Sequence, residues 1–308
     1  MRTIAVMDIT SSRPVSRRRF LAMSAAVGAG VVGSGSFLAA CGGGTAGDGK
    51  YAPEDLAVMQ RFSSSGLVPG NVRLPVSLAT KSEILDDAAT AAYATLTARI
   101  VNVQSGATVA DSLSATKHGE GLALPYWPFV APVTEPGTYT LVVDGASPDG
   151  AAFQVLDPAK VSMPVVGGKL PPFDTPTGDD PRGVDPICTL AAGVCPFHSV
   201  TLTDALRSGK PVVYLIGTPA FCKTGTCAPA LEGLVAVADK VGDAAVFVHA
   251  DVYADRTATT LAPAVQAYKL TFEPVLFVAG ADGVITNRLD GVFDRAEIAE
   301  VLASAGIS

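Results

Sequence analysis

The sequence changes its hydrophobic pattern at a proline-rich segment, residues 157–185, and this change most limits the folds open to the chain. Before it, residues 63–156 carry short runs in which apolar and polar residues alternate, the pattern of half-buried strands. After it, residues 201–305 alternate apolar runs with stretches of helical spacing, which is typical of a parallel sheet with crossover helices. A chain of 308 residues can bury two such cores. We therefore predict an all-β sandwich followed by an α/β domain.

The predicted sandwich spans residues 63–156. We expect strands over residues 72–78, 96–103, 138–143 and 152–156. The segment from Glu135 to Val143 resembles strands of immunoglobulin-like sandwiches, because a Pro-Gly turn leads into alternating Tyr, Leu and Val. We expect the single tryptophan, Trp127, in the core and His118 in a solvated loop. The prolines after residue 157 predict a linker or strap over residues 157–197.

The first forty residues resemble an export signal. Arg17 and Arg18 stand before Phe20-Leu21 in a twin-arginine pattern, and Leu38-Ala39-Ala40-Cys41 resembles the lipobox of bacterial lipoproteins. The resemblance implies removal of residues 1–40, acylation of Cys41, and a tether over residues 41–62. An uncleaved membrane helix is the alternative, which the glycines of the apolar run disfavour. We expect a lipid-anchored protein on the extracytoplasmic face of a bacterial membrane, and its net charge of −7 argues against nucleic acid as a partner.

Export implies an oxidising compartment, so the four remaining cysteines are expected to pair. Twin-arginine substrates cross the membrane already folded, which favours pairing between cysteines that are near in sequence. Of the three possible connectivities, the local one joins Cys188 to Cys195 and Cys222 to Cys227. We predict a structural disulfide for Cys188 and Cys195, because they flank a loop outside the expected core elements.

The C-terminal elements follow one another in an informative order. We expect helices over 201–208, 227–241, 257–268 and 294–305, strands over 211–217 and 244–252, and a hairpin of 274–279 with 284–289. A cysteine pair follows the first long strand, and Pro274 opens the hairpin. Over residues 202–308 this order resembles the thioredoxin superfamily, which gives a thioredoxin-like domain over residues 198–308. The resemblance implies that Cys222 is the nucleophile, preceded by the aromatic Phe221, that Cys227 is the resolving cysteine, and that Pro274 is the cis-proline beside them.

The chemistry expected of this pair is thiol–disulfide exchange. A cysteine at a helix N-terminus has a lowered pKa, and Lys223 would add to this effect. Cys222 would attack a substrate disulfide and Cys227 would resolve the mixed disulfide. Four residues separate the cysteines instead of two, and residues 212–216 contain no carboxylate, so Glu273 is the candidate acid–base group. The expected partners are protein thiols and disulfides and a membrane reductant, with no cofactor and no metal.

Three other interpretations are open. The protein could be a redox-inert binding or scaffold lipoprotein in which both cysteine pairs are structural. It could be a peroxidase similar to Q-type peroxiredoxins, although Thr218-Pro219 lies one residue too far from Cys222 and no arginine is convincingly placed beside the thiolate. It could also bind copper as thioredoxin-like chaperones do, with His198 or His249 as the distant histidine.

Overall fold

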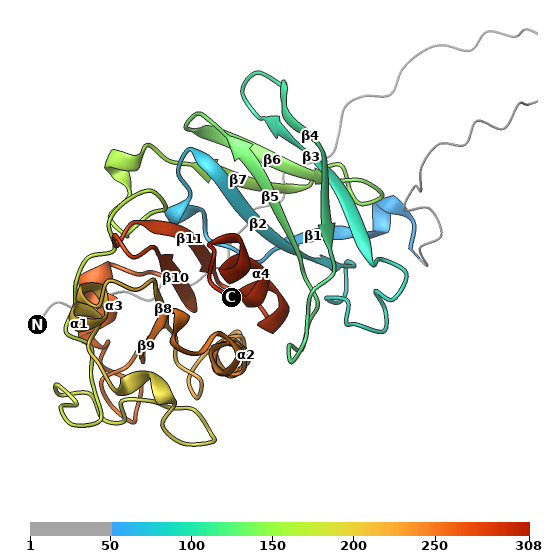
Figure 1. The fold of residues 1–308 in the computed structure, drawn as a ribbon. Helices are drawn as coiled ribbons and strands as arrows, with labels where there is room; N and C mark the ends of the chain where they lie inside the picture. The colour runs from blue at the N-terminus through green and yellow to red at the C-terminus, as the bar shows by residue number, and fades with distance from the viewer. Residues whose placement is uncertain (1–50) are drawn as a thin grey trace, which may run out of the picture. The chain divides into compact units, whose positions relative to one another are not determined.

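A computed structural model describes residues 51–308. The predictions for Arg17, Arg18 and Cys41, and those for the first ten residues of the tether, lie outside the described residues. The described chain is mostly β-sheet with few helices, as Figure 1 shows. Among these residues, none of the helices has the length and apolar character needed to cross a membrane.

The N-terminal half contains two antiparallel sheets, and their inner faces share one hydrophobic core. The first sheet has the order β1-β2-β5, made of β1 (Ala57–Gln60), β2 (Gly70–Ala79) and β5 (Trp127–Val133). The second has the order β4-β3-β6-β7, made of β3 (Thr95–Asn102), β4 (Thr108–Thr116), β6 (Gly137–Val143) and β7 (Ala151–Val155). Alternate residues of β5 and β7 are buried, as expected of strands with one face on a core. This arrangement is compatible with the predicted sandwich.

Two single-residue predictions for this half have opposite outcomes. Trp127 is fully buried, and its Nε1 donates a hydrogen bond to the carbonyl oxygen of Tyr93 at 3.0 Å, so its placement in the core is confirmed. The prediction of a solvated His118 is wrong, because only 8% of this residue is exposed and its Nδ1 lies 2.9 Å from a carboxylate oxygen of Asp294. The partner is 176 positions away in sequence, so no local pattern could reveal it.

The C-terminal part contains a four-stranded sheet of order β11-β10-β8-β9. Its strands are β8 (Val212–Ile216), β9 (Val246–Ala250), β10 (Val275–Ala279) and β11 (Ile285–Asp290). Strands β8 and β9 are parallel, while β10 is antiparallel to both β8 and β11. The helices are α1 (Leu202–Arg207), α2 (Cys227–Val241), α3 (Pro263–Tyr268) and α4 (Arg295–Ser304).

Helices cover both faces of this sheet. One apolar cluster joins one face to α1 and α3, and a second joins the other face to α2 and α4. Every residue of β8 and β10 is therefore buried, which explains why both strands are uninterrupted apolar runs. The predicted strands and helices of this part are confirmed, but α3 begins only at Pro263. The residues before it wrap around Asp255, whose carboxylate accepts hydrogen bonds from the backbone N–H groups of Thr257 and Thr260.

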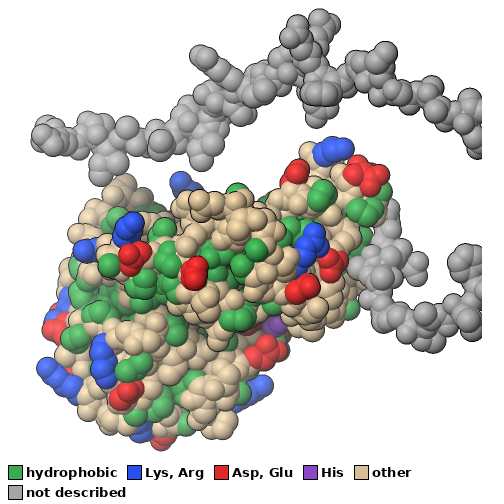
Figure 2. Space-filling model, turned by 90° about the horizontal axis from the view of Figure 1, so that it is seen from above, with side chains coloured by type: hydrophobic (Ala, Val, Ile, Leu, Met, Phe, Trp, Pro, Cys, Tyr) green, Lys and Arg blue, Asp and Glu red, His purple; other side chains and the backbone are tan. Residues whose placement is uncertain are grey.

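Residues 157–185 contain one short 3-10 helix, η3 (Pro158–Lys160), and otherwise no helix or strand, and residues 167–170 bond to the backbone beside β11. The backbone of Gly167 donates to Ile285, and that of Leu170 donates to Gly283. The hydroxyl of Tyr268 donates to the carbonyl oxygen of Pro171. On the face seen in Figure 2, acidic and basic side chains are interspersed with polar and hydrophobic ones.

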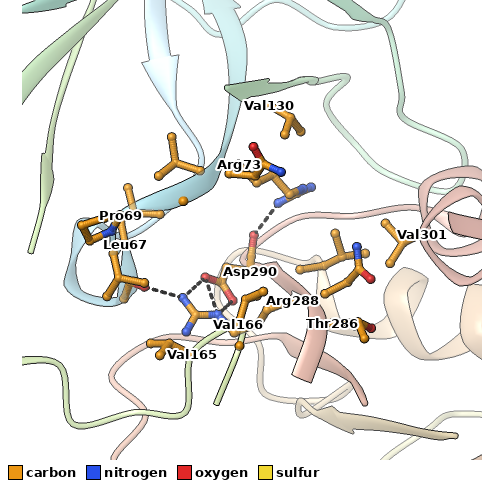
Figure 3. Close-up of a pocket in the computed structure, with 18 of the residues that line it drawn as sticks. Leu67, Pro69, Arg73, Val130, Val165, Val166, Thr286, Arg288, Asp290 and Val301 are labelled. Atoms are coloured by element: carbon orange, nitrogen blue, oxygen red, sulfur yellow. Dashed lines mark hydrogen bonds and ion pairs between the residues drawn. The ribbon is translucent and has the colours of Figure 1, made fainter. Parts of the chain in front are cut away.

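A cavity of about 370 Å³ lies where β2 approaches β11 and residues 165–167 (Figure 3). Its polar wall is a buried ion pair of Arg288 and Asp290, with Nη2 and Oδ2 2.8 Å apart. Arg288 also donates to the carbonyl oxygens of Gly66 and Pro164. Each guanidinium nitrogen therefore has a partner, and the bonds hold residues from the two halves of the chain around Arg288.

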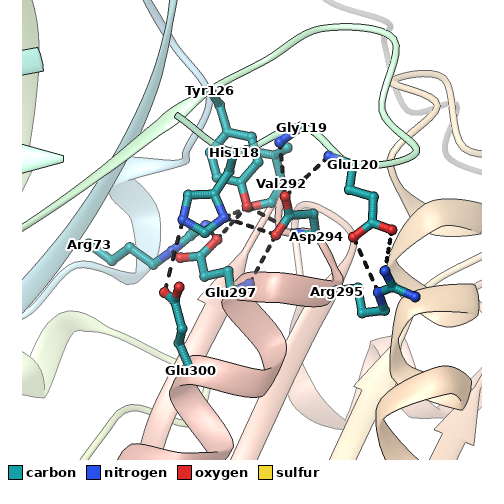
Figure 4. A network of polar contacts seen from close by, with 10 residues as sticks. All are labelled: Arg73, His118, Gly119, Glu120, Tyr126, Val292, Asp294, Arg295, Glu297 and Glu300. Atoms are coloured by element: carbon teal, nitrogen blue, oxygen red, sulfur yellow. Dashed lines mark hydrogen bonds and ion pairs between the residues drawn. The ribbon is translucent and has the colours of Figure 1, made fainter. Parts of the chain in front are cut away.

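A buried polar network joins the sandwich to helix α4 (Figure 4). Arg73 of β2 forms a two-point ion pair with Glu297, at 2.5 and 2.7 Å, and Tyr126 donates to the same carboxylate at 2.6 Å. Asp294 is the N-cap of α4, and its carboxylate accepts from the backbone of Glu297 at 2.9 Å. That carboxylate also contacts His118, so one side chain caps the helix and holds the sandwich loop.

Candidate active site: two cysteines at the start of helix α2

Cys222 and Cys227 are brought together by the loop that links β8 to α2. The backbone N–H of Cys222 donates to Thr218, and the carbonyl oxygen of Cys222 accepts from Gly225. Gly225 adopts a φ of 68°, a conformation that favours glycine, and the chain then enters α2 at Cys227. The four-residue gap is therefore a closed turn that returns the chain to the helix.

The two cysteines differ in exposure. Cys222 is partly exposed, whereas Cys227, in the first turn of α2, is only 1% exposed. Their sulfur atoms and a carboxylate oxygen of Glu273 all lie within 4.8 Å of one another. This arrangement provides an accessible sulfur, a protected sulfur and a carboxyl group in one place.

The surroundings stabilise a thiolate at Cys222. The thiol of Cys227 is the largest influence: as a hydrogen-bond donor it helps lower the pKa of Cys222 to about 4, although burial opposes the shift. The hydroxyl of Thr224 and the backbone N–H groups of Thr226 and Cys227 act in the same direction. The same hydrogen bond, together with burial and the charge of Glu273, raises the pKa of Cys227. Lys223, predicted to support the thiolate, is exposed.

Glu273 is held in a partly buried position beside the two sulfurs. Burial and the negative charges of Cys222 and Asp251 raise its pKa to about 7. Its Oε2 is buried and has no hydrogen-bond partner among the described residues. The peptide bond from Glu273 to Pro274 is cis, as the resemblance implied.

Gly217 leaves room for this packing. A Cβ atom built on Gly217 would lie 3.3 Å from Cβ of Pro274 and 3.5 Å from Sγ of Cys227. A Cβ at this position would therefore crowd Pro274 and lie in ordinary van der Waals contact with the buried sulfur.

Three neighbours of the site carry no recognisable signal in the sequence. Tyr253 meets Phe221 edge to face, with ring centroids 6.0 Å apart. Asp251 is buried and accepts hydrogen bonds from the backbone and hydroxyl of Thr189, at 3.1 and 2.7 Å. Thr189 in turn accepts from the backbone of Ala220 in the cysteine loop. These contacts join segments that are distant along the chain, so only the tertiary fold brings them together.

Cys188 and Cys195 form a second, separate sulfur pair. Both are buried, and all four cysteines of the described residues are free thiols in the structure. The structural disulfide between Cys188 and Cys195 stays a prediction. His198 and His249, weighed from the sequence as distant copper ligands, group with this second pair.

Comparison with protein-family models found no match to this chain, and comparison with curated proteins found no relative.

Proposed function

We propose that the protein is a thiol–disulfide oxidoreductase that acts on protein partners through Cys222 and Cys227. The observation that carries this proposal is the difference between the two sulfurs, one partly exposed with a lowered pKa and one buried beside a carboxyl group. A pair that served only as a disulfide staple would not need this asymmetry. A loop so short would also contribute only about 2 kcal/mol as a staple.

The order of elements around the site supports assigning residues 198–308 to a thioredoxin-like domain. Helix α2 follows β8 directly, Pro274 directly precedes β10, and the sheet order is β11-β10-β8-β9. The shared core of the N-terminal sheets supports an immunoglobulin-like sandwich as the preceding domain. The same fold can support different activities, so the proposed function depends on the residues of the site.

The proposed reaction proceeds in two exchange steps. The thiolate of Cys222 attacks one sulfur of a substrate disulfide, a mixed disulfide forms, and the other substrate sulfur leaves as a thiolate that takes a proton from solvent. Cys227 then loses its proton and attacks Sγ of Cys222. The Cys222–Cys227 disulfide forms, and the second substrate thiol is released. Two electrons pass to the substrate, and an external dithiol must return them to the protein.

Glu273 is suited to accept the proton of Cys227 in the second step. A carboxyl group with a pKa of about 7 is partly ionised at neutral pH, which is favourable for a general base. The hydrogen bond to the Cys222 thiolate, which raises the pKa of Cys227 most, is absent in the mixed disulfide, but burial still raises this pKa, so a neighbouring base favours ionisation of the thiol.

We further propose that the protein acts on the extracytoplasmic face of a bacterial membrane, anchored through an acylated Cys41. This part of the proposal depends on the sequence resemblances of residues 1–41. Cys41→Ser should move the protein from the membrane fraction to the soluble fraction of cells that export it. A variant that stays in the membrane fraction would argue for a retained helix instead of a lipid anchor.

The activity is tested by following reduction of insulin disulfides with a dithiol as the electron source. Cys222→Ser should abolish the catalysed rate, and Cys227→Ser should stop after one exchange with substrate covalently attached. Val109→Ser, at an exposed site on β4, is a matched control and should retain the native rate. Equal rates for the native protein and Cys222→Ser would contradict the proposed activity and would favour the redox-inert scaffold protein. Faster consumption of hydrogen peroxide than of insulin disulfides would indicate a thiol peroxidase.

A further inference from the structure

Two cysteines and two histidines converge outside the redox pair. The sulfur atoms of Cys188 and Cys195 and one ring nitrogen each of His198 and His249 all lie within 4.8 Å of one another. None of the four residues is more than 6% exposed, although the loop residues just before Cys195 are exposed. Four side chains of types that can bind metal therefore lie together in the interior, and they come from a surface loop and from the end of β9.

The hydrogen bonds of the histidines fix which ring nitrogens are free. Nε2 of His249 lies 3.0 Å from the carbonyl oxygen of Gly217, and Nδ1 of His198 lies 3.2 Å from that of Pro176. A carbonyl oxygen only accepts, so each of these nitrogens carries a hydrogen and, in a neutral ring, the other nitrogen presents a lone pair. Metal-binding histidines are commonly held in this way by backbone carbonyls.

The two free nitrogens face each other. Nε2 of His198 and Nδ1 of His249 are 3.1 Å apart, and Sγ of Cys195 is 3.6 Å from the same Nδ1. Two lone pairs at that distance repel unless a cation or a proton lies between them. In a tetrahedral zinc site the usual bond lengths place two nitrogens about 3.3 Å apart, and a nitrogen and a sulfur about 3.6 Å apart.

From this geometry we propose that Cys188, Cys195, His198 and His249 form a tetrahedral zinc(II) site. Binding of Zn²⁺ would release the two thiol protons to solvent, and the resulting site with two thiolates and two neutral imidazoles carries no net charge. A neutral site suits an interior position, where an uncompensated charge is costly. Four protein ligands leave no position for substrate, so the role is structural.

The proposed zinc site would fasten the loop of residues 188–198 to β9. Phe197, between two ligands, already stacks on Phe247 of β9 with ring centroids 5.4 Å apart. The same two sulfurs were predicted to form a structural disulfide, and the two assignments exclude each other. The redox pair contributes no ligand to this site.

The test uses the full native chain, purified under non-reducing conditions and dialysed against a weak chelator. We expect one zinc per chain by elemental analysis. X-ray absorption should give two sulfurs at about 2.3 Å and two nitrogens at about 2.0–2.1 Å. Removal of zinc with a strong chelator should expose two further thiols to alkylation, counted by mass spectrometry without added reductant. These measurements need no ligand variant and so do not depend on a variant that folds.

Variants then assign the ligands. Cys195→Ser and His198→Asn should lose the tightly held zinc, whereas the double variant Cys222→Ser/Cys227→Ser should retain one zinc per chain. This control separates the zinc proposal from the redox proposal, because the control variant is inactive in insulin reduction but loaded with metal. The proposal is overturned by a native chain free of metal with a Cys188–Cys195 disulfide, by loss of zinc in the double variant, or by stoichiometric binding of another metal in place of zinc.

Discussion

The sulfur of Cys222 has a testable acid–base behaviour. In the reduced native protein, we expect its alkylation rate to rise with an inflection near pH 4 and to change little from pH 5 to 8, because the thiolate is already formed. The measurement is the rate of iodoacetamide labelling of the peptide that contains Cys222. The same peptide in the unfolded chain is the control, and it should titrate near the ordinary cysteine value of about 8.5. An inflection near that value in the folded protein would remove the argument for an activated nucleophile.

Glu273 should control the second exchange step. Glu273→Gln removes the proposed base, and general-base catalysis typically contributes about 10²–10⁴-fold, so we expect at least a hundredfold slower release of the mixed disulfide. The native rate of that release should rise with pH as Glu273 ionises, and the variant should lack this rise. Burial still raises the pKa of Glu273 in the mixed disulfide, but the charge of Cys222 is absent there, so the inflection should lie below pH 7. Stopped-flow quenching followed by mass spectrometry measures the mixed disulfide. The rate of the first attack by Cys222 is the internal control and should change little.

The same substitution, Glu273→Gln, slows the reaction but should make the folded protein more stable at high pH. The folded pKa of Glu273 lies above its ordinary value of 4.5, so the native protein loses stability as the pH rises from 4.5 through about 7, where the buried carboxyl must ionise. Glu273→Gln cannot ionise and should keep that stability. Urea unfolding at pH 5 and pH 8 measures the difference, and a variant less stable than the native protein at pH 8 would contradict it.

At the scale of elements, the sequence predicts the C-terminal part better than the sandwich. Strands such as β8 and β10 are buried on both faces, so their apolar runs are visible without any knowledge of their neighbours. Strand β5 was missed because it contains Pro128 and Pro132, which a strand tolerates at the edge of a sheet, where β5 lies. Strand β4 was missed because most of its residues are exposed, and Ser112 interrupts it with a φ of 52°.

The residues of the candidate site also differ in how well the sequence predicts them. The roles of Cys222, Cys227 and Pro274 could be predicted because the order of helices and strands resembles the thioredoxin superfamily, and that order is visible in the local apolar pattern. The grouping of Cys188 and Cys195 with His198 and His249 does not, because it depends on how a loop without regular structure folds back onto β9. The spacing of these residues in the sequence does not predict that the loop folds back onto β9.

The start of helix α4 should give the protein a pH-dependent stability. Burial alone would lower the pKa of His118, but the hydrogen bond and charge of Asp294, with the charges of Glu297 and Glu300, raise it. A raised folded pKa gives a contribution that is complete below the unfolded value of about 6.5 and is lost as the pH rises through the folded value. We expect His118→Gln to cost about 1–3 kcal/mol below pH 6 and less at higher pH.

Denaturant unfolding of both proteins across this range measures the effect. The interaction stabilises Asp294 as well: burial would raise its pKa, but His118 and the backbone N–H groups of Glu297 and Gly119 lower it to about 2. The carboxylate's contribution is therefore lost only as the pH falls from 3.8 towards 2, well outside the His118 window. A difference between native and His118→Gln that does not change between pH 5 and 9 would contradict the proposed titration.

At the scale of the whole molecule, the network in Figure 4 should make the two halves unfold together. Trp127 is the single tryptophan and lies in the sandwich core, whereas the α-helices of the described residues all lie in the C-terminal part. Tryptophan fluorescence and helical circular dichroism therefore report on different halves. We expect coincident unfolding curves for the native protein, because the buried ion pair of Arg73 and Glu297 couples the halves.

Glu297→Gln should weaken this coupling. Removal of one partner from a buried ion pair typically costs about 3–5 kcal/mol, since the other charge is left uncompensated. The two curves should then shift to lower denaturant concentration and separate. Lys81→Gln breaks an exposed ion pair with Asp55 and is the matched control, expected to change stability by less than about 1 kcal/mol. Separate curves already in the native protein would mean that the halves fold independently.

Gly217 lies between the cysteine pair of the proposed redox site and the proposed zinc site. On one side it lies against Cys227 of the redox pair, and on the other its carbonyl oxygen holds His249 of the proposed zinc site. A shift of this single peptide would change the surroundings of both sites, so we expect zinc content to influence the proposed electron transfer through Cys222 and Cys227. A reduction potential measured on a preparation with partial zinc would average two populations, and samples should be matched for metal before their potentials are compared.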